Sequence, residues 1–190
     1  MRKGNLFIIS GPSGAGKGTL VKAILPLVPD IWVSVSMTTR APRLGEVEGR
    51  HYFFVSEEEF TRLAETGGLL EWAEVHGNRY GTPRVAVDAK IADGRQVVLE
   101  IDPQGAFQVK CLVPDSTLIF IMPPSIDELQ RRLVGRGSET EAQLTTRIET
   151  ARRELELVGE YDHVVLNEDV PRAAAELVAL IDSHANTEDA

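Results

Sequence analysis

The residues best suited to chemistry lie at 11–19, which read Gly-Pro-Ser-Gly-Ala-Gly-Lys-Gly-Thr. The glycines let the backbone curl so that successive N–H groups form a nest for anionic oxygens at a helix N-terminus. Lys17 adds a positive charge where the β- and γ-phosphates of a nucleotide would lie. An apolar run at 6–9 precedes the segment and an amphipathic run at 20–27 follows it, so the pattern predicts a phosphate-binding loop between a strand and a helix.

This loop departs from the usual pattern at one position. Gly18 follows the lysine, where most such loops place a serine or threonine that contacts Mg²⁺. Thr19 comes one residue later. We therefore expect a bound Mg²⁺ to be held mainly by water and nucleotide oxygens, with Thr19 close by.

Two arginines suggest a second anion site. Arg40 and Arg43 flank Pro42, which stiffens their loop and keeps both guanidinium groups near one point. Arginine meets phosphate oxygens with two parallel hydrogen bonds, and the hydroxyls of Tyr52 and Tyr80 could donate to the same anion. A solvated basic loop is the simpler interpretation of the arginines alone. The phosphate-binding loop upstream makes a second anion site the favoured one.

These motifs together resemble those of guanylate kinases. The resemblance covers about residues 5–181 and is carried, in the family's order and spacing, by segments 11–19, 36–46, 49–52, 71–73, 80–82, 100–105 and 132–137 and by Arg147. It implies an enzyme that transfers the γ-phosphoryl group of ATP to GMP or dGMP, giving ADP and GDP. The phosphate-binding loop alone would indicate only a nucleotide-binding superfamily.

The resemblance also implies which residues bind GMP: Ser36, Arg40, Arg43, Tyr52, Glu71, Tyr80, Thr82 and Asp102. Glu71 is chemically apt, because one carboxylate can accept hydrogen bonds from both guanine N1–H and the guanine 2-amino group. A surface carboxylate on a hairpin is the alternative interpretation of Glu71. Glu100 and Asp102 would share one side of a strand, and the sequence leaves open which of them senses the metal ion. Glu100 and Thr19 are the candidate metal ligands.

For the donor side, the resemblance assigns ATP binding to Gly11, Pro12, Ser13, Gly14, Ala15, Gly16, Lys17, Gly18, Thr19 and Asn167. It assigns catalysis to Lys17, Arg132, Arg136 and Arg147, with Mg²⁺ bound together with ATP. The acceptor is already an anionic phosphate, so no side chain has to remove a proton from it. Alignment and positive charge are what such a transfer requires.

Apolar stretches of strand length alternate with helical ones, which is typical of an α/β fold with a parallel sheet covered on both faces. Strands are expected at 6–10, 31–37, 96–101, 117–122 and 163–166, making a five-stranded P-loop core from 1–37, 89–124 and 152–190. Residues 38–88 form a predicted α+β GMP-binding insertion with a hairpin at Gly77-Asn78. Residues 125–151 form a predicted helical lid, with capping boxes at Ser125 and Ser138.

The composition of the chain limits the class of protein, its partners and its location. The chain has 190 residues, 43% hydrophobic and 26% charged, as in ordinary globular proteins. The net charge of −9 argues against nonspecific binding to nucleic acid. No apolar run approaches the roughly 20 residues of a membrane span, the start is too short for a signal peptide, and the single Cys111 fits a reducing compartment. We expect a cytoplasmic protein, favour a monomer, and expect Cys111 to be buried.

Two other interpretations stay open at this point. A guanylate-kinase-like binding module without activity would resemble this chain, but such modules commonly lack the intact phosphate-binding loop and the lid arginines. A kinase for another nucleoside monophosphate would keep Lys17 and the arginines, but it would give no role to Glu71 together with Ser36 and Thr82.

Overall fold

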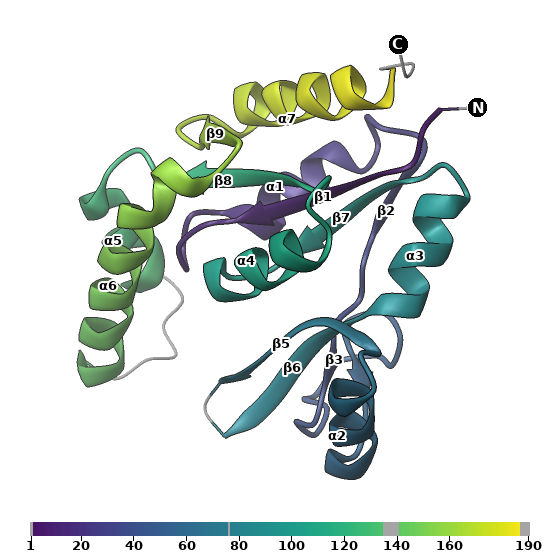
Figure 1. Ribbon diagram of the computed structural model, residues 1–190. Helices are drawn as coiled ribbons and strands as arrows, with labels where there is room; N and C mark the ends of the chain where they lie inside the picture. The colour runs from purple at the N-terminus through teal and green to yellow at the C-terminus, as the bar shows by residue number, and fades with distance from the viewer. Residues whose placement is uncertain (1, 76, 135–140, 187–190) are drawn as a thin grey trace.

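The computed structural model describes residues 2–75, 77–134 and 141–186, apart from the side chains of 141–143. A five-stranded parallel sheet forms its centre (Figure 1), and the strands in spatial order are β2 (Ile31–Val33), β7 (Gln96–Glu100), β1 (Asn5–Ser10), β8 (Thr117–Met122) and β9 (His163–Leu166). The predicted five-stranded parallel core is confirmed.

Both faces of this sheet are buried, which explains its continuous apolar strands. Successive residues of a strand point to opposite faces. Phe7 and Ile9 of β1 therefore pack on the side of α1 (Lys17–Ile24) and α7 (Val170–Ala185). Leu6 and Ile8 pack on the other side, with α3 (Arg84–Ala92) and α4 (Pro103–Leu112). The carboxyl ends of the strands all lie at one edge, where ligands bind in such folds.

A second, smaller sheet lies beside the first (Figure 1), with the order β4 (Phe53–Phe54), β3 (Met37–Thr38), β6 (Asn78–Pro83) and β5 (Leu69–Val75). Strands β5 and β6 form the predicted antiparallel hairpin. Helix α2 (Glu57–Glu65) packs on this sheet through the fully buried Phe60. The hydroxyl of Ser56 accepts a hydrogen bond from Glu59 N at 3.2 Å, so Ser56 caps the N-terminus of α2.

The single strand predicted at 31–37 is wrong. Ser34 N still donates to Val98 O of β7 at 2.9 Å, whereas the carbonyl of Ser36 accepts from Phe53 N of β4 at 2.9 Å. The chain therefore leaves the first sheet and enters the second between these two residues. An extended polar-apolar run looks the same in sequence whether it stays in one sheet or joins two.

Helices α5 (Ile126–Val134) and α6 (Glu141–Glu156) pack together through Leu129, Leu133 and Ala151. Ser125 Oγ accepts from Glu128 N at 3.0 Å, as the capping box predicts. The second predicted capping box at Ser138 and the candidate catalytic residue Arg136 lie outside the described residues. A short 3₁₀ turn, η1 (Leu157–Glu160), leads from α6 to β9. The division into core, insertion and lid stays a prediction.

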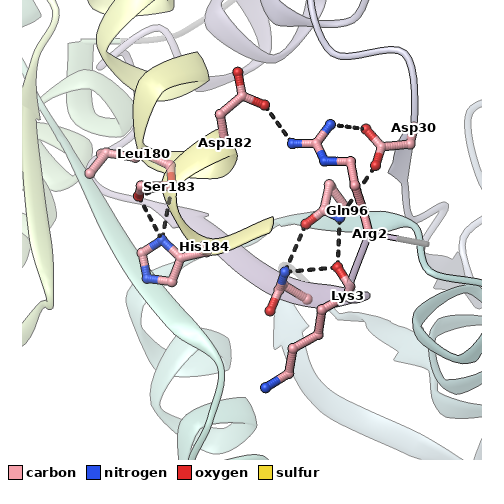
Figure 2. Close-up of polar contacts among 9 residues, drawn as sticks. Arg2, Lys3, Asp30, Gln96, Leu180, Asp182, Ser183 and His184 are labelled. Atoms are coloured by element: carbon pink, nitrogen blue, oxygen red, sulfur yellow. Dashed lines mark hydrogen bonds and ion pairs between the residues drawn. The ribbon is translucent and has the colours of Figure 1, made fainter. Parts of the chain in front are cut away.

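The two ends of the described chain meet at the amino edge of the central sheet (Figure 2). Arg2 donates from Nη1 to Asp30 Oδ1 at 2.8 Å and from Nη2 to Asp182 Oδ1 of α7 at 2.5 Å. Gln96 Nε2 donates to the carbonyl of Lys3 at 2.8 Å. This network fixes the edge of the sheet opposite the strand ends that carry the candidate site.

Two observations bear on the expectations from composition. Cys111 is exposed, so the expectation that it is buried is wrong. Ala106 and Val109 are the residues of α4 that face the sheet, and Cys111 lies on another side of the helix. Within the described part of the chain, no helix combines the length and the apolar character needed to cross a bilayer.

Candidate active site

The phosphate-binding loop joins β1 to α1 and borders a cavity of about 290 Å³. Gly11, Gly14 and Gly16 have φ values of 132°, 89° and 92°, a region that residues with side chains rarely adopt. The lining residues are Pro12, Ser13, Gly14, Gly16, Lys17, Gly18, Thr19, Lys22 and Glu100. The structure thus brings together most of the residues that the sequence assigns to ATP.

Lys17 lies folded over its own loop. Its Nζ donates to Gly11 O at 2.5 Å and to Pro12 O at 3.2 Å. These two carbonyl groups hold the ammonium group beside the cavity, where it would attract an anion that enters. The side chain therefore lies where a phosphate-binding lysine is needed.

Asn167, from a segment distant in the sequence, contacts the backbone of the phosphate-binding loop. Asn167 follows β9, is 2% exposed, and donates from Nδ2 to Ala15 O at 2.7 Å. A methyl group on Gly16 would lie 2.4 Å from the same Nδ2, so the amide fills the space that the glycine leaves. The sequence assigns Asn167 to the adenine or ribose of ATP, and the structure places its amide against the loop backbone.

Arg132 of α5 also reaches the loop. Its Nη1 donates to Ala15 O at 3.4 Å and its Nη2 to Asn167 O at 3.3 Å, while Glu128 Oε1 accepts from its Nε at 2.8 Å. A guanidinium group held in this way lies next to the cavity that the loop borders. Arg147 lies half-buried on α6.

Sequence reasoning missed Glu154. This carboxyl group reaches from α6 to the loop, where it accepts a hydrogen bond from Ser13 N and lies near Lys17. Burial raises its pKa, and Lys17 opposes that shift. In sequence, Glu154 stands among Arg152, Arg153 and Glu156 on a charged helix, so nothing distinguishes it from a solvated residue.

A second cavity of about 300 Å³ lies between the two sheets, lined by Ser36, Tyr52, Glu71, Ala73, Val75, Tyr80, Glu100, Ile101 and Asp102. Five of these residues are candidates that the sequence assigns to GMP, although they come from distant segments. Glu100 lines both cavities, at the end of β7. Strand β7 ends there, and Asp102 instead caps α4 by accepting from Gly105 N at 2.8 Å.

Glu71 is the buried carboxylate of this second cavity. Glu71 is only 7% exposed, and the hydroxyl of Thr82 on the neighbouring strand donates to its Oε1 at 2.6 Å. Burial raises the pKa of Glu71 to about 7; the charge of Asp102 adds to the rise and the Thr82 hydrogen bond opposes it. The alternative of a surface carboxylate on a hairpin is excluded.

Arg40 lies at the rim of this cavity. Its guanidinium carbon is 5.5 Å from the centre of the Tyr52 ring, and Glu46 Oε1 accepts from its Nη2 at 2.9 Å. The ion pair with Glu46 raises the pKa of Arg40, and a hydrogen bond with Tyr80 contributes. Glu46 also accepts from the backbone N–H of Arg43 at 2.7 Å, whereas the side chain of Arg43 is exposed. Glu46 thus orders the loop, a role that the sequence did not assign.

A phosphate-binding loop at the carboxyl edge of a parallel sheet, facing a second polar cavity, defines a P-loop α/β protein of the phosphotransferase type. The chain belongs to the guanylate kinase family, since the family model described as guanylate kinase matches residues 3–184.

Similar proteins agree with this assignment. A guanylate kinase of Synechococcus sp. (strain CC9311) is 51% identical over 170 residues, 90% of each chain. A guanylate kinase of Desulfitobacterium hafniense (strain Y51) is 51% identical over 178 residues, 94% of this chain and 89% of that protein. The crystal structure of guanylate kinase from Anaplasma phagocytophilum has a TM-score of 0.79 at 35% identity, covering 98% of this chain and 89% of that one.

Proposed function

We propose that this chain transfers the γ-phosphoryl group of ATP to GMP or dGMP, giving ADP and GDP. The single observation that carries the proposal is the buried Glu71, held by Thr82 in a cavity that shares the wall residue Glu100 with the phosphate-binding loop. Donor and acceptor cavities on two sides of one residue suit a direct transfer between two bound nucleotides.

Glu71 gives the acceptor cavity its preference for guanine. Guanine offers N1–H and the 2-amino group along one edge, and both can donate to one carboxylate. Adenine has neither of these donors, so it would leave a buried carboxylate without partners. Sites built on such hydrogen bonds reject analogues that lack them by a factor of about 10⁴ or more.

The phosphate of the acceptor would lie at the rim, where Arg40, Tyr52 and Tyr80 gather. On the donor side, Lys17 and Arg132 supply positive charge around the transferred group, because Lys17 belongs to the loop and Arg132 of α5 contacts its Ala15 carbonyl. We assign Arg136 and Arg147 to the same task on the resemblance of the sequence. These groups would align two anions and offset their repulsion, which is the main requirement of phosphoryl transfer.

The donor cavity also fits Mg²⁺. That ion prefers oxygen ligands and is commonly held by one or two carboxylates together with substrate phosphates. The Glu100 carboxylate and Thr19 both line the donor cavity and supply oxygen only. We propose that they lie next to the ion, which would neutralise phosphate charge. We further propose a monomeric enzyme of the cytoplasm, acting on small molecules rather than nucleic acid or membranes.

A nucleotide panel tests the function. With ATP and Mg²⁺, we expect ADP formation with GMP and dGMP, and a kcat/KM for AMP lower by about 10⁴ or more because Glu71 would be left unpaired. A coupled assay that follows ADP gives the rates for GMP, dGMP, AMP, CMP and UMP. Equal rates for AMP or CMP would refute the guanine argument. Binding of GMP without ADP formation would favour a binding module instead.

The affinity for GMP should depend on pH through Glu71. Because its pKa is about 7 in the folded protein, the ionised form that accepts both guanine donors falls to roughly one tenth at pH 6. The KM for GMP should therefore be nearly constant above pH 8 and rise about tenfold per pH unit below 7. The measurement is KM for GMP between pH 5.5 and 8.5.

The Glu71→Gln variant is the control for this pH profile, because a phosphate monoester also titrates near pH 6. The variant keeps the substrate's titration and lacks that of Glu71. A profile in wild type that matches the profile of the variant would remove Glu71 as the titrating group.

A further inference from the structure

The strand that carries Glu71 is attached to the central body through α4. Trp72 N donates to Gln108 Oε1 at 3.2 Å, and Gln108 Nε2 donates to Trp72 O at 3.2 Å. Strand β5 is the last strand of its sheet, so its outer backbone groups face α4 instead of another strand. The Gln108 amide makes the pair of hydrogen bonds that a neighbouring strand would make, directly beside Glu71.

A β-bulge adds a second attachment at the same place. Leu69 pairs with Pro83 and Glu71 with Thr82, so Leu70 is an extra residue on β5. Such bulges redirect side chains and are common next to active sites. Leu69 packs in the core of the small sheet, whereas Leu70, 1% exposed, belongs to the same core cluster as the α4 residues Ala106 and Val109. The backbone before and after Glu71 is therefore fixed to α4.

The Glu71 carboxyl group itself lies against the first turn of α4. A methyl group on Gly105 would lie 2.8 Å from Glu71 Oε2, closer than such atoms approach, and 3.3 Å from Glu71 Cδ, a tight contact. Gly105 is buried and helical and has no positive φ, so its backbone conformation does not call for glycine. Glycine lowers helix stability relative to alanine. The space it leaves for Glu71 is a physical reason for its presence.

We propose that Gly105 and Gln108 are specificity-determining positioning residues: together they set where the Glu71 carboxylate lies. Neither lines the donor or the acceptor cavity, and each acts through Glu71 or its neighbour Trp72. The inference rests on the proposed function, because it explains how the guanine-binding group is placed. It assigns part of the guanine preference to a helix that would not touch the nucleotide.

Gly105→Ala is the sharpest test. Its new methyl group must displace the Glu71 carboxylate, and small misplacements of a binding group can cost up to about 10²-fold. We expect the KM for GMP to rise between about tenfold and 10²-fold and the preference for GMP over AMP to fall, with an unchanged KM for ATP. Alanine favours the helix, so the melting temperature should not fall. If Gly105 had a purely structural role, the KM for GMP would not change separately from the KM for ATP and the melting temperature.

Gly159→Ala is the matched control. Gly159 lies in η1, and a methyl group there would meet no atom within 4 Å. We expect its kinetic constants to equal those of wild type. Adding Gly105→Ala to Glu71→Gln should cause no further loss for GMP, because residues that act through one another are not additive.

Gln108→Leu tests the second positioning residue. It keeps the size of the side chain and removes both hydrogen bonds to Trp72, so the KM for GMP should rise several-fold with little change for ATP. If wild type prefers GMP and Gly105→Ala retains the wild-type KM and preference, the inference is overturned. If wild type itself does not prefer GMP over AMP, the proposed function fails, a result visible before any variant is made.

Discussion

Replacing Lys17 by alanine should abolish phosphoryl transfer, lowering kcat by about 10³-fold or more, while the fold persists. A single cationic group that stabilises the transferred phosphoryl group contributes about 10³-fold or more to kcat. In the structure, Lys17 Nζ donates to Gly11 O and Pro12 O of its own loop, next to the donor cavity. The loop keeps its shape by other means, because Asn167 and Arg132 hold Ala15 O.

The measurement is the ADP-coupled assay together with circular dichroism and a melting curve. Lys90→Ala is the matched control, since Lys90 lies on α3 and pairs at 3.4 Å with Asp93 of the same region. Lys90→Ala removes the same positive charge at a position far in sequence from the phosphate-binding loop, so it should leave kcat unchanged. A Lys17→Ala protein that is folded and retains a tenth of the wild-type rate would refute the assigned role.

Glu71→Gln should lower kcat/KM for GMP by about 10²-fold to 10⁴-fold with little change in the KM for ATP. Glutamine keeps the shape of glutamate but offers one acceptor oxygen, and its NH₂ group would face a guanine donor. Thr82 now donates to Glu71 Oε1 at 2.6 Å and could still donate to the amide oxygen. The nucleotide panel on purified variant and wild type gives the result.

A measurement of thermal stability distinguishes the loss of kcat/KM for GMP from unfolding of the Glu71→Gln variant. The pKa of Glu71 is raised in the folded state, so the folded protein binds more protons than the unfolded chain between about pH 4.5 and 7. The destabilisation grows as pH rises through that window and is complete above pH 7, where it amounts to about 3 kcal/mol. Glutamine carries no charge, so the variant should melt no lower than wild type at pH 8.

Glu74→Gln is the control for this experiment. Glu74 lies three residues further along β5, is exposed, and should be replaceable without effect on GMP. Unchanged GMP kinetics in Glu71→Gln would return Glu71 to a structural role. A selective loss in Glu71→Gln alone would support its contact with guanine.

The sequence predicts the core well, because each of its buried strands is an apolar run between helices. Strand β8 and strand β9 have the predicted bounds, Thr117–Met122 and His163–Leu166. The strand predicted at 31–37 fails for a reason that periodicity does not contain. The break between β2 and β3 depends on which carbonyl groups lie within reach after folding, such as Val98 O for Ser34 and Ser36 O for Phe53.

The sequence predicts those residues of the candidate site that would contact the nucleotide. It does not predict the residues that act through another residue. Ser36, Tyr52 and Glu71 line the acceptor cavity, and resemblance assigned them. Glu154 and Gly105 were not assigned, because a glutamate on a charged helix and a glycine in a helix show their importance only through a distant neighbour. The binding roles of the assigned residues remain predictions that the variants above test.

Gly18 and Glu100 form a pair whose identities constrain each other. A methyl group on Gly18 would lie 3.2 Å and 3.3 Å from the two carboxylate oxygens of Glu100, so a serine or threonine there would require the carboxylate to shift by a few tenths of an ångström. That carboxylate also lines the acceptor cavity. A substitution in the donor loop would thus be transmitted to the acceptor side. In evolution, the two positions are expected to change together, with a longer residue at 18 accompanied by a shorter one at 100.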